Sequence, residues 1–175
     1  AAALEEEGRE VVKQFVEAGG GYVGICAGAF LAASNYSWSL GISNHKTFCE
    51  TVDVQGIGRK SMWFRGGSAP VTMELTDEGR KILGDFEGVF EVRYQNGPIM
   101  SPMGREGLGN FRSLSHFRSE VSKYKPQEGT MINTPAVIVG EYGNGRVLCI
   151  SPHPESTDAL NRLVQNAVRW TARRR

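Results

Sequence analysis

The feature that most constrains the fold is a cysteine placed between a short apolar run and a run of helix-forming residues. Residues 19–25 read Gly-Gly-Gly-Tyr-Val-Gly-Ile, Cys26 follows, and residues 27–33 read Ala-Gly-Ala-Phe-Leu-Ala-Ala. A strand that turns sharply into a helix crowds the backbone, so small residues are needed around the turn. The pattern predicts a nucleophile elbow with Cys26 at its tip. Because helix N–H groups and the helix dipole favour an anion, we expect a lowered pKa for this thiol.

A second informative segment, Ser-Pro-His-Pro-Glu over residues 151–155, lies far from the first in the sequence. Thiol chemistry needs a base for the sulfur and a group that orients the base. His153 can be that base, and Glu155 can accept a hydrogen bond from its imidazole because residues i and i+2 of an extended chain share a side. The prolines keep the segment out of a helix. The alternatives are a buried structural cysteine and a Glu155 that only begins the last helix.

Several segments of the chain resemble the class I glutamine amidotransferase superfamily, and most closely its branch related to the N-terminal domain of biotin-protein ligases. The resemblance implies a flavodoxin-like mixed sheet flanked by helices, with Cys26 as nucleophile, His153 as base and Glu155 as the group that orients it. The segments that carry it are residues 19–29, 63–67 (Trp-Phe-Arg-Gly-Gly), 94–98 (Tyr-Gln-Asn-Gly-Pro), 135–138, 142–146 and 152–155.

The same resemblance sets an expectation for the start of the chain. Members of the superfamily have a strand–helix–strand unit and a Pro-Gly-Gly loop ahead of the elbow, and this sequence starts in the helix just before the elbow strand. We therefore expect a single domain over residues 1–175 that lacks this first unit. The backbone N–H of Ala27 is the expected oxyanion donor, and the family's second donor lies in the absent loop. We expect a longer protein, a homo-oligomer or a second chain to complete the site.

Further candidates for substrate binding lie beside the cysteine and in one turn. Gly24 and Gly28 flank the elbow, and Tyr94, Asn96 and Gly97 belong to a second segment of the resemblance. An Asn-Gly pair is equally typical of a plain turn between strands, and both interpretations stay open.

Composition excludes several classes of function. The chain has 175 residues, of which 40% are hydrophobic and 22% charged, as in ordinary globular domains. A formal charge of +1 gives no electrostatic attraction to nucleic acid. No apolar run approaches the about 20 residues that a membrane helix needs. The three cysteines predict no disulfide framework, and no His/Cys spacing indicates a zinc site. We expect no cofactor and no metal, and we favour a cytoplasmic location.

Periodicity and turn residues predict an alternation of helices and strands. Helices are expected over residues 4–18, 27–34, 76–83 (capped by Thr76) and 157–173 (capped by Ser156 or Thr157). Strands are expected over 21–25, 51–54, 71–75 and 89–94, the last extended over 98–103, with a hairpin of 136–141 and 146–150. Residues 36–50 are expected to be irregular, and 104–125 are unassigned. The core faces of the first and last helices are expected to contain Leu4, Val11, Val12, Phe15, Val16, Leu160, Leu163, Val164, Ala167 and Val168.

Two functions are compatible with these features. The first is a cysteine-dependent amide hydrolase, similar to glutamine amidotransferases, that acts on glutamine or a related small amide through a thioester. The second is a non-catalytic ligand-binding or regulatory domain of the same fold.

Overall fold

A six-stranded mixed sheet forms the centre of the computed structural model, which describes residues 4–54, 56–62, 67–121 and 130–172. β1 pairs with β10 in parallel, and the other neighbouring strands of this sheet are antiparallel. The predicted α/β class with a mixed, flavodoxin-like sheet is confirmed. The strands, in their order across the sheet, are β1 (Gly21–Ile25), β10 (Gly145–Ile150), β9 (Pro135–Tyr142), β8 (Arg112–Phe117), β5 (Ser68–Leu75) and β6 (Val89–Gln95).

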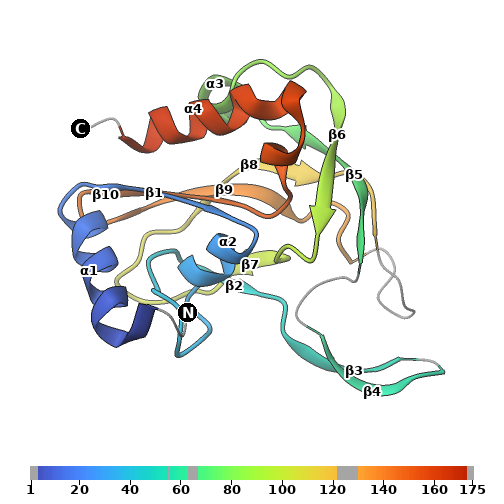
Figure 1. Ribbon diagram of the computed structural model, residues 1–175, viewed down its shortest axis with the longest axis horizontal. Coiled ribbons are helices and arrows are strands. Elements are labelled where there is room, and N and C mark those ends of the chain that lie inside the picture. Colours follow the sequence, from blue (N-terminus) through green and yellow to red (C-terminus); the bar gives the residue numbers. More distant parts are fainter. Residues whose placement is uncertain (1–3, 55, 63–66, 122–129, 173–175) are drawn as a thin grey trace.

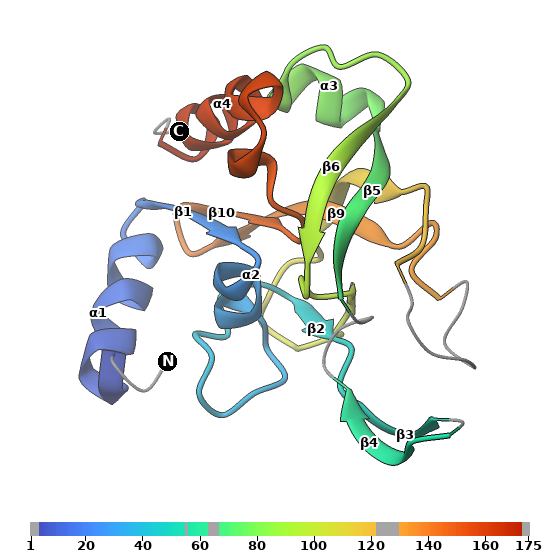
Figure 2. The ribbon, with the colours of Figure 1, turned by 45° about the vertical axis from the view of Figure 1, so that its right-hand side comes forward.

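Helices cover both faces of the sheet, as Figures 1 and 2 show. α1 (Glu5–Glu17) and α2 (Ala27–Ala32) lie on one face, and α3 (Asp77–Leu83) and α4 (Asn161–Ala172) lie on the other. The strands alternate their side chains between two apolar clusters, one on each face. None of the helices in the described ranges is both long and apolar enough to cross a membrane.

Local sequence signals placed several of these elements correctly. α1, β1 and α2 follow each other as predicted, and the hairpin of β9 and β10 turns between Tyr142 and Gly145. α3 is capped as expected, because the Thr76 hydroxyl oxygen accepts a hydrogen bond of 3.0 Å from the Gly79 N–H.

Other elements differ from the prediction. The segment after β6 does not extend it, because β7 (Met100–Pro102) pairs with β2 (His45–Thr47) in a separate two-stranded sheet. β2 lies in the stretch expected to be irregular, and β8 lies in the unassigned stretch. A hairpin of β3 (Glu50–Val54) and β4 (Gly58–Met62) projects from the body in Figures 1 and 2.

The last helix starts later than predicted. Two short 3-10 turns, Pro154–Ser156 and Asp158–Leu160, precede α4, which begins at Asn161. Pro154 at the start of the first turn has no backbone N–H to donate, and the Thr157 side chain makes no capping hydrogen bond to the second turn. Glu155 lies in the first of these turns, and His153 directly precedes it.

Part of the predicted core is exposed. Val11 and Phe15 are each 60% exposed and Val168 is 50% exposed, so the expected core faces of both terminal helices are wrong at these positions. The reason is the topology, because β1 is the edge strand of the sheet and no described strand lies beyond it.

Candidate active site

Strand pairing brings the two predicted motifs to the same edge of the sheet. β1 and β10 run in parallel with Ile25 opposite Ile150, and the Cys26 N–H donates a 2.8 Å hydrogen bond to the Ile150 carbonyl oxygen. The chain leaves both strands at this point. Cys26 therefore follows β1 where Ser151 and His153 follow β10, at the carboxyl ends where α/β proteins gather their sites.

The backbone at Cys26 is strained, as expected of an elbow. Its φ of 50° and ψ of −102° fall in a region that residues with a side chain rarely adopt. Gly24 permits the turn, since a Cβ there would lie 2.6 Å from the backbone carbon and oxygen of Gly28 and 2.7 Å from the Tyr22 ring. The Tyr22 hydroxyl donates to the Gly28 carbonyl oxygen at 2.8 Å, and burial raises the pKa of this hydroxyl. Gly24 is thus a structural part of the elbow.

The end of β6 lies against both motifs. The Cys26 thiol donates to the Gln95 carbonyl oxygen at 3.4 Å, and the backbone N–H of His153 donates to the Arg93 carbonyl oxygen at 2.7 Å. Carbonyl groups two residues apart on a strand lie on the same side, separated by about 7 Å. Cys26 and His153 thus contact neighbouring carbonyl groups on the same side of β6.

His153 and Glu155 form a directly bonded pair. The His153 Nδ1 and the Glu155 Oε1 are 2.6 Å apart, and the two side chains are 21% and 41% exposed. A carboxylate on Nδ1 holds the proton on that nitrogen and leaves Nε2 as the basic nitrogen of the ring. The hydrogen bond between Glu155 and the His153 imidazole, which the sequence analysis predicted, is thus present.

The expected lowering of the Cys26 pKa is wrong. Burial raises the pKa of the thiol, the backbone N–H of Ala27 acts in the lowering direction, and the negative charge of Glu155 raises it further. The helix that follows has six residues, so its dipole is small. In the resting protein, Cys26 is a neutral thiol that donates to Gln95.

The second candidate segment forms a turn packed against the segment of His153. Asn96 has a φ of 56° and its N–H donates to the Gly67 carbonyl oxygen at 3.4 Å. Tyr94 is fully buried, and its hydroxyl donates to the Gly97 carbonyl oxygen at 2.7 Å. This hydrogen bond stabilises the turn. A Cβ on Gly97 would lie 2.1 Å from the Ser151 carbonyl oxygen, which shows how closely the two segments pack.

Two groups at the site were missed by the sequence analysis. One is the main-chain carbonyl of Gln95, which has no sequence signal because every residue carries one. The other is Ser151, whose side chain is fully buried and whose signal was its place in the Ser-Pro-His-Pro-Glu segment. Within the described ranges, no three His, Cys, Asp or Glu side chains gather as a metal site would require.

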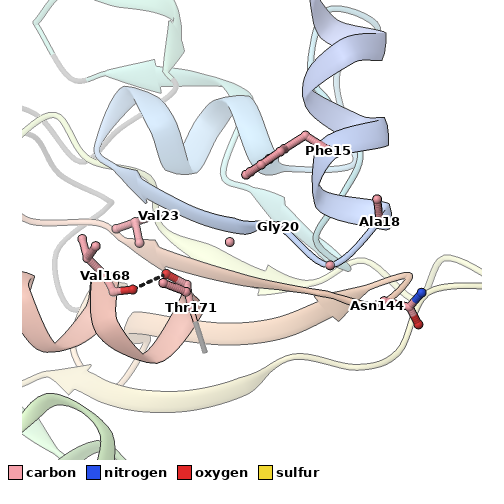
Figure 3. Close-up of a pocket in the computed structure, with 10 residues that line it drawn as sticks. Phe15, Ala18, Gly20, Val23, Asn144, Val168 and Thr171 are labelled. Carbon is pink, nitrogen blue, oxygen red and sulfur yellow. Dashed lines mark hydrogen bonds between the residues drawn. The ribbon is translucent and has the colours of Figure 1, made fainter. Parts of the chain in front are cut away.

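A groove of about 950 Å³ lies away from this site, along the open edge of β1. In Figure 3, Phe15 of α1 lies on one side of the groove, and Val168 and Thr171 of α4 lie on the other. None of the predicted catalytic residues lines it. The groove is lined by Phe15, Ala18, Gly19, Gly20, Gly21, Val23, Asn144, Val168, Thr171 and Ala172.

A buried histidine supports the helix that follows the elbow. His45 is fully buried, with Nε2 3.2 Å from the Ala29 carbonyl oxygen and Nδ1 2.9 Å from the Ser43 hydroxyl. Burial lowers the pKa of this imidazole to about 4, and the bond to Ala29 opposes that effect. The neutral ring therefore joins α2 to the segment that leads into β2.

The protein is expected to lose stability as the pH falls from about 7 to about 4, because unfolded His45 takes up a proton near pH 6.5 and the folded form resists it. The loss attributable to this residue is about 3 kcal/mol at pH 4. Urea unfolding at several pH values measures it, with a His45→Gln variant that cannot titrate as the comparison. Equal pH dependence in the two proteins would contradict the assignment.

Comparison with known proteins identifies a family and a fold. A model of the family described as "Biotin-protein ligase, N terminal" matches residues 1–172. No curated protein matches the chain. A ThuA-like protein from Bacteroides uniformis is 17% identical with a TM-score of 0.59, over 95% of this chain and 64% of that one. A β-galactosidase from Bacillus circulans sp. alkalophilus is 14% identical with a TM-score of 0.56, over 94% of this chain and 21% of that one.

A cytoplasmic protein from Salmonella typhimurium is a further structural neighbour. It is 15% identical with a TM-score of 0.54, over 95% of this chain and 61% of that one. The chain therefore spans less than two thirds of each of these three solved structures, and its likeness to them is one of fold.

Proposed function

The chain belongs to the biotin-protein ligase N-terminal family, and we propose that it is a cysteine-dependent amide hydrolase similar to glutamine amidotransferases. The observation that carries the proposal is that the strained backbone of Cys26 follows β1, while the bonded pair of His153 and Glu155 follows β10, the strand that pairs with β1 in parallel. Nucleophilic catalysis by a thiol needs the thiol itself, a base and a group that orients the base. These parts come from two segments that only the pairing of β1 with β10 brings together.

The proposed reaction begins with transfer of the Cys26 proton to Nε2 of His153, as the thiol leaves its bond to the Gln95 carbonyl. The sulfur then forms a bond to the amide carbon, and the oxyanion accepts a hydrogen bond from the Ala27 N–H. His153 returns the proton to the amide nitrogen, the carbon–nitrogen bond breaks, and ammonia leaves a thioester. Water attacks the thioester with His153 as base, which releases the acid and restores the thiol.

The direct test is ammonia release from L-glutamine and from simple primary amides by the protein and by a Cys26→Ala variant. Release that depends on Cys26 supports the proposal. Equal release by both proteins contradicts it, because the chemistry would then not pass through the sulfur.

A non-catalytic ligand-binding or regulatory domain is the second candidate. The raised pKa of Cys26 favours it, since a thiolate is the reactive form of cysteine. Under the catalytic proposal the bound substrate and His153 must remove this proton. A protein that binds a small amide and leaves it intact at any pH identifies the binding domain instead.

We further propose that the protein is cytoplasmic. We also propose that a second copy of the chain covers the open edge of β1. The Cys26 N–H and the Gly20 carbonyl point toward β10, so Gly21, Val23 and Ile25 point their backbone groups to the open edge. An antiparallel pair of β1 strands centred on Val23 satisfies these groups symmetrically.

Two exposed side chains beside that edge, Phe15 and Val168, also become covered in such a dimer. Sedimentation at micromolar concentration is expected to show a dimer, and a Val168→Lys variant is expected to weaken it about tenfold or more. A protein that sediments as a monomer contradicts the dimer without affecting the proposed chemistry.

A further inference from the structure

Two polar atoms at the candidate site are buried without a hydrogen-bond partner in the part of the chain that the structure describes. They are the Oδ1 of Asn96 and the Oγ of Ser151, and the side chain of Ser151 is fully buried. Buried polar groups are nearly always paired, so such orphans indicate a ligand or a functional role. Ser115, a second fully buried serine, shows the usual situation, because its hydroxyl donates to the Glu74 carbonyl oxygen at 3.0 Å.

Both orphan atoms belong to residues next to the contacts of Cys26. Ser151 follows Ile150, whose carbonyl accepts the Cys26 N–H, and Asn96 follows Gln95, whose carbonyl accepts the thiol. The turn after Asn96 packs directly on Ser151, since a Cβ on Gly97 would lie 2.7 Å from the Ser151 Oγ. The two orphan groups thus lie on adjoining segments, each in the residue that follows a hydrogen-bond partner of Cys26.

The chemistry of these atoms defines what they can receive. An amide oxygen only accepts hydrogen bonds, and a serine hydroxyl can accept or donate. A primary amide nitrogen carries two N–H donors, one for each acceptor. An ester oxygen or a carboxylate brings acceptors alone and leaves the Asn96 oxygen unpaired. The Asn96 and Ser151 oxygens together therefore favour a ligand group that donates hydrogen bonds.

We propose that Asn96 and Ser151 hold the –NH₂ group of the substrate amide, and so make the site specific for amides over esters. This inference rests on the proposed amide hydrolysis. It assigns the two residues a role in specificity, beside the leaving nitrogen that His153 protonates. After the carbon–nitrogen bond breaks, the ammonia that leaves still carries the donors that the two oxygens accept.

The test compares L-glutamine with L-glutamate γ-methyl ester, which lacks the N–H donors. In Ser151→Ala and in Asn96→Gly, kcat/KM for the amide is expected to fall about tenfold while that for the ester stays the same. Glycine suits position 96 because the backbone there has a φ of 56°. The two variants are independent, so a folding failure of one leaves the other to decide.

Thermal unfolding separates specificity from structure. Ser115→Ala, the matched control, is expected to lower Tm and keep the ratio of amide to ester turnover, because it removes a made hydrogen bond. Ser151→Ala is expected to keep Tm and change the ratio. A lowered Tm with an unchanged ratio in Ser151→Ala, and an unchanged ratio in Asn96→Gly, overturn the inference. Absence of any Cys26-dependent turnover overturns the proposed function as well.

Discussion

Replacement of Cys26 by alanine is expected to reduce ammonia release from a small amide by roughly 10⁴-fold or more, because no other group at the site can form the thioester. The fold should persist, since alanine keeps the Cβ at this strained position and loses only a half-buried sulfur. Circular dichroism and thermal unfolding check the fold, and an ammonia assay checks the activity.

The other two cysteines provide the controls for this result. Cys49 is exposed and Cys149 is fully buried, and burial raises the pKa of Cys149 to about 12. Because a chloromethyl ketone analogue of glutamine would bind at the elbow under the proposal, it should modify Cys26 far faster than Cys49 or Cys149 and stop ammonia release. Modification of Cys49 at the same rate would show that exposure, and not substrate binding at the elbow, directs the reagent.

The Gly24→Ala substitution is expected to destabilise the protein by about 2–3 kcal/mol. The added methyl group would lie 2.6 Å from backbone atoms of Gly28 and 2.7 Å from the Tyr22 ring, so β1 and α2 must move apart. Because that movement displaces Cys26, amide hydrolysis should fall as well. Urea unfolding measures the free energy, and the ammonia assay measures the activity of the folded fraction.

Gly28→Ala is the matched control for this substitution. It lies in α2, and a Cβ there would meet only the Tyr22 hydroxyl oxygen, at an ordinary 3.7 Å. Alanine is the better helix former, so a gain of up to about 1 kcal/mol is expected. Equal destabilisation by both substitutions would show that the elbow has no special need for glycine at position 24.

Local rules were sufficient where a few adjacent residues decide the structure. Small residues around Cys26 predicted the elbow, and Thr76 predicted the start of α3, because the atoms that form these features are close in sequence. The same rules missed β8, whose polar residues alternate weakly in the sequence. Its place in the sheet depends on pairing with β9, the next strand, and with β5, which is separated from it along the chain by α3, β6 and β7.

The candidate site likewise has some features decided by adjacent residues and others decided by contacts between distant segments. The sequence by itself determined which residues form the two local motifs, namely Cys26 at a crowded turn and His153 bonded to Glu155, because each motif is a matter of local backbone and neighbouring side chains. Only the tertiary structure decided that Gln95 accepts the thiol and that Cys26 has a raised pKa. Both depend on β6 and on burial, which arise from contacts between segments far apart in the chain.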